Sequence, residues 1–417
     1  MNLLRLAWAS ICNRWVMALL VVLTIALSSA LLIGVDIMRV EAKRSFERTV
    51  SGADLIVGAR TGAVPLLLYT VFHIGEPSNN MSYASYTEIA AKKNVAWTIP
   101  ISLGDSHRGY RVIGTRGAFF EHYKFGSKRS LGFSSGAAFT GLFDVVIGAE
   151  VAQKLGYQIA ADVVLAHGTG KVSFAKHDKL PFKVVGILNR TGTPIDRSLL
   201  VSLEAITAIH IGWETGIGIG QITPETLAQR DLTPTSITAF MLGLNNRIAT
   251  FALQREINQF KTEPLMAVLP TATLQQLWQL VGVAENALLI VSAAVVLAGL
   301  LAMLVALWAS LEQRRREMAI LRALGARAVE IFGLLILESA VMTLLGLALG
   351  LLLLFATLSL AGPALASSYG LYLEDARLSI RSVQLLGGIF LVSLLISALP
   401  AFVAYRKALG DALAIRL

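Results

Sequence analysis

The chain has 417 residues, of which 55% are hydrophobic and only 15% are charged, and its mean hydropathy is +0.65. Soluble domains usually carry about a quarter charged residues, so this composition excludes a disordered chain and a collagen-like fibre and argues against a purely soluble enzyme. The single cysteine, Cys12, permits neither an internal disulfide nor a cysteine-rich metal cluster. The net charge of +9 indicates nucleic-acid binding only if the basic residues gather on one surface.

Four apolar stretches are long enough to cross a bilayer, whose hydrocarbon core needs about 20 helical residues. They are Trp15–Val35, Asn286–Leu311, Ile331–Ala361 and Val383–Tyr405. Only the third contains a charged residue, Glu338. The first stretch is not followed by a convincing small-x-small cleavage site, so we interpret it as a retained anchor and not as a signal peptide.

Lysine and arginine in the short segments predict the orientation. The N-terminal tail has Arg5 and Arg14 and no acid, and the connector after the second span has five arginines against three glutamates. Both tails and this connector are therefore expected in the cytoplasm. The predicted order is a cytoplasmic tail (1–14), a first span (15–38), a periplasmic domain (39–283), a second span (284–311), a cytoplasmic coupling helix (312–330), a third span (331–361), a periplasmic loop (362–382), a fourth span (383–405) and a cytoplasmic tail (406–417).

The segment 39–283 has the pattern of a mixed α/β domain. Short β-branched runs between glycine or polar breaks predict strands at 54–57, 111–113, 144–147, 162–165 and 182–188, with short helices at 150–155 and 202–210. The segment holds 24 basic and 18 acidic residues, a dispersed surplus of six, so we expect no nucleic-acid partner. The expected fold class is an α-helical membrane protein with four transmembrane helices, one before and three after a large mixed α/β extracytoplasmic domain.

Both ends of this domain are predicted to continue the helices of the membrane. Residues 39–49 contain neither glycine nor proline, so the first helix can extend outward as a stalk. At the other end, Thr273 and Gln276 form a capping-box pattern that predicts a helix start, and apolar residues at helical spacing follow it into the second span. Two rigid stalks of this kind can carry motion across a membrane.

The motifs of the outer domain indicate no enzyme and no nucleotide site. All six histidines lie in it, namely His73, His107, His122, His167, His177 and His210. No two of them stand at a ligand spacing such as i, i+4, so we interpret them as unrelated histidines and predict no metal site. The segment 168–171 resembles part of a phosphate loop, but Leu165 replaces its first glycine and Val172 its final Ser or Thr, which favours a simple turn.

The connector between the second and third spans has the strongest pattern in the chain. Met318, Leu321 and Leu324 fall on one apolar face of a helix, charged residues occupy the rest, and Gly325 marks a helix end. Such a helix can lie on the membrane, held by anionic lipid headgroups, or it can bind a partner protein.

The amino-acid sequence of this connector resembles the signature of the MacB/FtsX-like ABC permease family. That signature has an arginine, two residues, a glutamate, a small apolar run and then Leu-Arg-Ala-Leu-Gly-Ala, and here it covers 314–326. Glu338 early in the third span, the closing segment 399–406 and the segments 146–156 and 182–194 of the outer domain are similar to the family as well. The arrangement of one span, a large domain and three spans is the family's.

The resemblance implies a permease without an activity or cofactor of its own. Family permeases pair with a second copy or a homologous permease and bind a cytoplasmic ABC ATPase dimer, which holds the ATP and Mg. Because only about 14 residues precede the first span, the ATPase is expected to be a separate chain. The output would be mechanical work at the periplasmic side of a bacterial inner membrane, on a lipoprotein, peptide or drug or through a periplasmic accessory protein.

The residues that would couple this chain to the ATPase are Arg316, Glu317, Leu321, Arg322, Leu324, Gly325 and Ala326. The charged ones can make charge-assisted contacts and the leucines an apolar anchor. Glu338 is costly within a span, so it has either a function or a partner among the connector arginines. Gly346 and Gly350 fit close helix packing. The alternative is a membrane-anchored periplasmic binding or sensor protein whose outer domain captures a ligand, such as a metal bound through its histidines.

Overall fold

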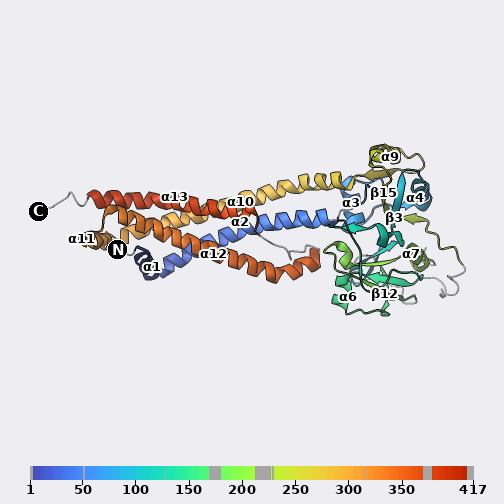
Figure 1. Ribbon diagram of the computed structural model, residues 1–417, viewed down its shortest axis with the longest axis horizontal. Coiled ribbons are helices and arrows are strands. Elements are labelled where there is room, and N and C mark those ends of the chain that lie inside the picture. The colour runs from blue at the N-terminus through green and yellow to red at the C-terminus, as the bar shows by residue number, and fades with distance from the viewer. Residues whose placement is uncertain are drawn as a thin grey trace. The chain divides into compact units, whose positions relative to one another are not determined.

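The computed structural model describes residues 3–49, 52–126, 128–168, 180–211, 227, 230–313, 315–369 and 378–410. The chain divides into two compact units. The membrane unit comprises Met1–Ala42 and Gly282–Leu417, and the outer unit comprises Lys43–Val281. Figure 1 shows long helices in the first and strands with short helices in the second.

Four helices are long and apolar enough to cross a membrane: α2 (Trp15–Thr49), α10 (Pro270–Gln313), α12 (Ala328–Tyr369) and α13 (Ile380–Gly410). This confirms one span before and three after a mixed α/β region. Two shorter helices accompany them, α1 (Leu3–Asn13) and α11 (Arg315–Ala323). The helix α1 occupies most of the segment that we predicted as a tail.

Helices α2 and α10 are longer than a bilayer requires. Their 35 and 44 residues correspond to about 52 and 66 Å at a rise of 1.5 Å per residue, whereas a hydrocarbon core is about 30 Å thick. The first continues without a break to Thr49, as the absence of glycine and proline after Arg39 predicts. Both helices therefore have one or two dozen residues in excess of a span.

Two predicted helix boundaries are wrong. Helix α10 begins at Pro270 and not at Thr273, because proline, which lacks an N–H group, suits the first helical position. Thr273 lies buried inside the first turn, where its N–H donates to the carbonyl of Leu269. Helix α12 continues to Tyr369, so part of the predicted loop 362–382 is helical, and residues 370–377 of that loop lie outside the described residues.

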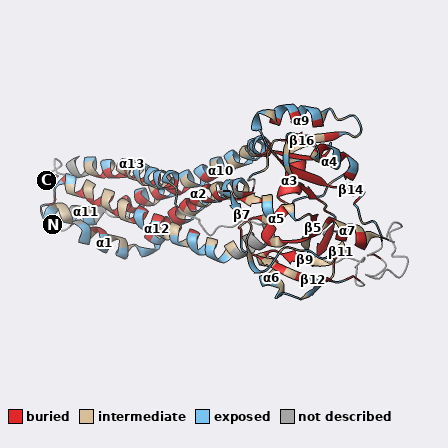
Figure 2. Ribbon diagram, turned by 45° about the vertical axis from the view of Figure 1, so that its right-hand side comes forward, coloured by how far each residue is buried: buried red, intermediate tan, exposed pale blue. Residues whose placement is uncertain are grey.

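The membrane helices turn many large apolar side chains outward. Leu27 of α2, Ile290 of α10, Leu352 of α12 and Leu395 of α13 are each more than half exposed. Figure 2 shows such exposed and intermediate positions along these helices, while buried residues dominate the sheets. Lipid tails are as apolar as leucine, so outward apolar faces are stable in a membrane.

The outer unit contains two larger sheets. The first is antiparallel with the strand order β16-β1-β15-β3, and the second is mixed with the order β10-β12-β9-β13-β5-β4-β11, in which β8 also pairs with β12. The strands of the first are β1 (Leu55–Ala59), β3 (Val95–Ile101), β15 (Ala239–Leu244) and β16 (Leu265–Val268). Those of the second are β4 (Asp105–His107), β5 (Tyr110–Thr115), β8 (Phe133–Gly136), β9 (Asp144–Ile147), β10 (Asp162–Val163), β11 (Ala166–His167), β12 (Phe182–Leu188) and β13 (Ser198–Ser202).

Short helices and two small strand pairs complete the described part of this unit. The pairs are β2 (Met81–Ser82) with β14 (Ser236–Ile237) and β6 (Lys124–Phe125) with β7 (Arg129–Ser130). The helices are α3 (Ala63–Val71), α4 (Tyr83–Ala90), α5 (Ala118–His122), α6 (Ala149–Leu155), α7 (Leu203–His210), α9 (Thr250–Asn258) and the 3-10 turns η1 (Pro194–Arg197) and η2 (Arg247–Ala249). All seven predicted strands and helices are present, although β10 ends two residues before the predicted end at Leu165.

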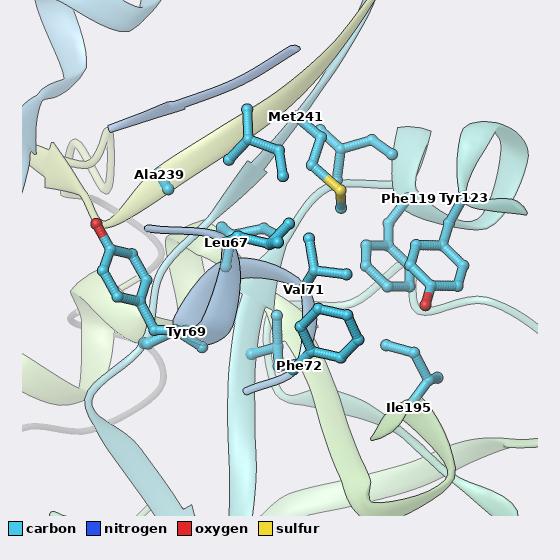
Figure 3. Close-up of a cluster of buried hydrophobic side chains, with 14 of the residues drawn as sticks. Leu67, Tyr69, Val71, Phe72, Phe119, Tyr123, Ile195, Ala239 and Met241 are labelled. Carbon is cyan, nitrogen blue, oxygen red and sulfur yellow. The ribbon is translucent and has the colours of Figure 1, made fainter. Parts of the chain in front are cut away.

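The largest core of the outer unit joins both sheets. Figure 3 shows Leu67 of α3 and Phe72, which directly follows α3, together with Phe119 of α5, Ile195 of η1 and Met241 of β15. The ends of the two long helices reach the same core, since Phe46 of α2 and Trp278 of α10 pack against it. Phe46 lies 4.4 Å from the Phe72 ring and 5.5 Å from the Trp278 ring, between centroids. Within the outer unit, the two stalk ends are thus packed onto each other and onto the sheets.

Candidate functional site: the coupling helix and the polar contacts of the spans

The short helix α11 has a sharply defined end. Gly325 adopts a φ of +94°, its N–H donates to the carbonyl of Arg322, and the Ala326 N–H donates to the carbonyl of Leu321. This pair of hydrogen bonds with a left-handed residue is a Schellman motif, which glycine adopts without steric cost. Gly325 ends the helix, as the sequence predicts. Ala326 is buried, and at Arg327 the backbone N–H is capped by the Glu330 carboxylate, 2.7 Å away, where α12 begins.

The predicted apolar face of α11 is divided between two surroundings. Met318 packs inward against a cluster of α10, α12 and α13 that includes Leu311, Leu335 and Ala401. Leu324 is 79% exposed, and Ile320, which was not among the predicted coupling residues, is 60% exposed. An anchored helix with exposed leucine and isoleucine offers a small apolar surface to a partner.

The charged residues of α11 differ in their contacts. The Glu317 carboxylate lies 3.6 Å from the Arg14 guanidinium, which also donates to the carbonyl of Ser310 at 3.1 Å. Arg14 thus joins the start of α2 to the end of α10 and to α11. Arg322 is half-buried, and the side chain of Arg316 lies outside the described part of the chain.

Helix α2 packs closely against two neighbours through glycines. A Cβ atom at Gly346 of α12 would stand 2.8 Å from the Ile25 side chain, and one at Gly350 would stand 2.7 Å from the Ala26 carbonyl oxygen. On α10, a Cβ atom at Gly299 would stand 2.9 Å from the Ser28 hydroxyl. The glycine pair of α12 therefore faces the first span of the same chain.

Polar side chains cluster inside the membrane unit on α12. Glu338, Ser339 and Thr343 are each at most 5% exposed. Thr343 donates to the Ser339 carbonyl and, at 3.0 Å, to the hydroxyl of Ser393 in α13. Because hydrocarbon cannot satisfy polar groups, such contacts hold helices together and fix their register.

A second buried acid, Asp36, was missed by the sequence reasoning. It is fully buried in α2, and its carboxylate accepts hydrogen bonds from Ser382 at 2.9 Å and Ser379 at 3.3 Å. Arg381 lies 3.6 Å from its other oxygen. Ser379 also caps α13 by accepting from the Ser382 N–H, so the carboxylate sits at the positive end of that helix. Asp36 directly follows the uncharged run that ends at Val35, and an acid at that position could have indicated a partner in another span.

In the outer unit, the structure brings together three residues that spacing along the chain did not connect. Asp105, His167 and His210 place one ligand atom each within 4.8 Å of one another. The other described histidines have separate surroundings: His73 contacts Ser198, His107 contacts Tyr157 and His122 stacks on Trp97. His177 and most of the segment 168–171 lie outside the described residues.

One span precedes the mixed α/β unit and three follow it, and a short capped helix lies between the second and third spans. This arrangement defines a class of membrane protein with a large periplasmic or extracellular domain. Residues 18–260 match the MacB-like periplasmic core domain, and residues 289–411 match the FtsX-like permease C-terminal domain. The chain belongs to the FtsX/MacB-type family of ABC transporter permeases. Members of this family typically lack catalytic activity themselves.

Two solved structures are similar to the chain at low identity. The periplasmic region of MacB from Actinobacillus actinomycetemcomitans is 9% identical over 56% of this chain and 97% of that chain, with a TM-score of 0.33. The extracellular domain of the noncanonic ABC-type transporter YknZ from Gram-positive bacteria is 10% identical over 45% of this chain and 89% of that chain, with a TM-score of 0.28. No curated protein matches the chain.

Proposed function

We propose that this permease couples ATP hydrolysis by a separate cytoplasmic ATPase dimer to mechanical work on the periplasmic side of a bacterial inner membrane. In this proposal both termini and α11 are cytoplasmic, and the permease pairs with a second copy or a homologous permease. The work is the export or extraction of a periplasmic or membrane-surface substrate, such as a lipoprotein, peptide or drug. The observation that carries the proposal is the exposed apolar end of α11.

The helix α11 is built to transmit force. Its inner side is held by Met318 in the cluster of three spans, and its Glu317 is tied to Arg14. A load applied at Leu324 therefore reaches α2, α10, α12 and α13 through packed side chains and an ion pair. Residues Arg316, Leu321, Arg322 and Gly325 complete the proposed coupling surface. The buried Ala326 supports this surface from within, and Glu338 supports the helix contacts of α12.

The length and pairing of α2 and α10 support the mechanical output. Each helix is continuous and longer than a bilayer is thick. In the membrane unit they are joined by the ion pair of Arg39 with Glu285 at 2.8 Å, and in the outer unit by the contact of Phe46 with Trp278. Two continuous helices that contact each other in the membrane unit and again in the outer unit can transmit a movement along their axes, whereas a flexible linker would not transmit it.

The test is the recruitment of ATPase activity by the full-length protein. We expect tagged wild-type protein, purified in mild detergent from its native cells, to carry vanadate-sensitive ATP hydrolysis. The variant Leu324→Asp should lower that activity at least tenfold, because a charge cannot enter an apolar groove of the ATPase without a large desolvation cost. Ile248→Asp is the matched control, since Ile248 is an 87% exposed apolar residue of the outer unit. Equal ATPase recovery with Leu324→Asp and Ile248→Asp, with both proteins folded by circular dichroism, would contradict the proposal.

A further inference from the structure

The three residues Asp105, His167 and His210 form a compact group at one edge of the large sheet. Asp105 lies in β4 and His167 directly opposite it in β11, so both side chains lie on the same face of the sheet. His210 is the last residue of α7, which packs on β5 and β13 of the same sheet. The group thus rests on paired strands and on a helix that covers them.

The distances within the group are those of a metal-ligand set. Asp105 Oδ1 lies 3.1 Å from His167 Nδ1 and 3.7 Å from His210 Nε2, and the two histidine nitrogens are 3.3 Å apart. A tetrahedral zinc ion with bonds of about 2.0–2.1 Å has ligand-to-ligand edges of about 3.3 Å. The three atoms therefore occupy one face of such a tetrahedron almost without rearrangement.

The orientation of His210 favours metal binding. Its Nδ1 lies 2.6 Å from the carbonyl oxygen of Ile206, and a carbonyl only accepts hydrogen bonds. Nδ1 therefore carries the proton, and in the neutral ring the lone pair is on Nε2, which faces Asp105 and His167. In metal-binding histidines the N–H of the second ring nitrogen characteristically donates to a carbonyl or carboxylate in this way, which fixes the ring and its tautomer.

The carboxylate of Asp105 provides an independent observation. Asp105 is only 2% exposed, and its Oδ1 makes no hydrogen bond with any described residue although it points toward the two imidazoles. A buried carboxylate oxygen that accepts no hydrogen bond is costly, and the two imidazoles form ion pairs with it only when they are protonated. A cation bound between Asp105 and the histidines would satisfy this oxygen without such a proton. The alternative occupant is a proton shared between the carboxylate and an imidazole.

We propose that the outer unit binds a divalent transition-metal ion, with Zn²⁺ as the first candidate, through Asp105, His167 and His210. Two imidazole nitrogens and one carboxylate oxygen form a donor set suited to Zn²⁺, Cu²⁺ or Ni²⁺ and not to Ca²⁺ or Mg²⁺, which prefer oxygen alone. The three ligands among the described residues leave a fourth position for water or another ligand. This site is additional to the coupling of ATP hydrolysis and does not depend on it.

His107 lies two residues from Asp105 on β4 but is not part of the site. Its Nδ1 contacts the Val164 carbonyl at 2.6 Å, and its Nε2 contacts the Tyr157 hydroxyl at 2.9 Å, so both nitrogens are occupied. Among the described residues, the site is thus limited to the three converging ones, and other described histidines of the outer unit can serve as controls.

The experiment uses the full-length protein in detergent, with a histidine-free affinity tag and Cys12→Ser, after removal of metal by a chelator. Titration with Zn²⁺ by calorimetry, and with Co²⁺ followed by its visible absorption, measures stoichiometry, affinity and coordination geometry. We expect one equivalent of each ion to bind, with the absorption of tetrahedral or five-coordinate Co²⁺. His210→Gln and His167→Gln should each weaken Zn²⁺ binding at least tenfold, and His122→Gln should leave it unchanged.

A second measurement separates metal binding from folding. Zn²⁺ should raise the thermal midpoint of the wild type and of His122→Gln but not that of His210→Gln, because only a ligand that binds the folded state shifts the midpoint. Without metal, the three proteins should melt at the same temperature. Asp105→Asn also tests the site, but His210→Gln decides the case because His210 is more exposed and its replacement disturbs the core less. Failure of the wild type to bind Zn²⁺ saturably, or equal affinity in the wild type and in both histidine variants, would overturn the proposal in favour of a shared proton.

Discussion

The membrane unit and the outer unit each contain an acid paired with a base at nearly the same distance. In the membrane unit, Arg381 lies 3.6 Å from Asp36, whose side chain is 1% exposed. In the outer unit, Lys183 lies 3.4 Å from Asp162, and both side chains are about two-thirds exposed. Water solvates Lys183 and Asp162 in the folded and in the unfolded chain, so their pairing changes the free energy of unfolding little. The Asp36 carboxylate has been removed from water and depends on its partners. The comparison teaches that burial, more than distance, determines what an ion pair contributes.

The same contrast applies to the apolar side chains. In the membrane unit, leucines and isoleucines are exposed along the spans and small polar residues lie between the helices. In the outer unit, large apolar side chains such as Phe119 and Phe240 are buried against the sheets. Specific polar contacts therefore have a greater share in the stability of the membrane unit than in that of the outer unit, where apolar burial dominates.

The largest effect expected from this comparison is that of Arg381→Met. The variant leaves the buried Asp36 carboxylate without a cation, and breaking such a pair costs about 3–5 kcal/mol when both groups are buried; since Arg381 is half exposed, we expect about 2–4 kcal/mol. The free energy of unfolding of the membrane unit, measured by steric trapping in bicelles, checks this value. Arg381→Lys, which keeps the charge, should lose less than half as much. A loss below about 0.5 kcal/mol for Arg381→Met would show that the serines and the end of α13 suffice for Asp36.

The pH dependence of the outer unit should depend on His73. Burial, followed by the positive charge of Arg111, lowers the pKa of His73 to about 3. In the unfolded chain a histidine takes up a proton near pH 6.5, so stability that is complete at neutral pH is lost as the pH falls from about 6.5 toward 3. Between pH 7 and 5.5 we expect a loss of about 1 kcal/mol from this residue, measured by hydrogen exchange of β13, whose Ser198 lies 3.2 Å from His73 Nδ1.

His73→Asn is the variant that isolates this contribution. The φ of His73 is +56°, in the left-handed region that asparagine tolerates better than most residues, so the backbone is preserved. The variant should show a smaller decrease in protection between pH 7 and 5.5 than the wild type. His107 remains as an internal reference, because burial lowers its pKa as well and its contribution persists in both proteins. Identical pH dependence in the two proteins would assign the effect to other groups.

Local signals in the sequence predicted a large part of the fold. Uninterrupted apolar composition identified the four spans, and the left-handed preference of glycine predicted the end of α11 at Gly325, since both depend on neighbours along the chain. Strand pairing is different: Asp105 and His167 meet only because β4 pairs with β11, and His210 joins them only because α7 packs on the same sheet. The contact of Asp36 with Arg381 likewise requires the packing of α2 against α13. Spacing along the sequence contains neither relation.

The smallest effect should be that of Lys183→Met, which removes the exposed partner of Asp162 in the outer unit. The pair is shorter than that of Arg381 with Asp36, so if distance alone determined its contribution, this variant would be the more destabilising one. Because both groups remain solvated, we expect a change below about 0.5 kcal/mol in the free energy of unfolding of the outer unit, measured by hydrogen exchange of β12. At about 1 M salt, where the screening length falls to about 3 Å, wild type and variant should become indistinguishable. A salt-independent loss above 1 kcal/mol would mean that the cross-strand packing of the lysine stem, and not its charge, stabilises the edge formed by β10 and β12.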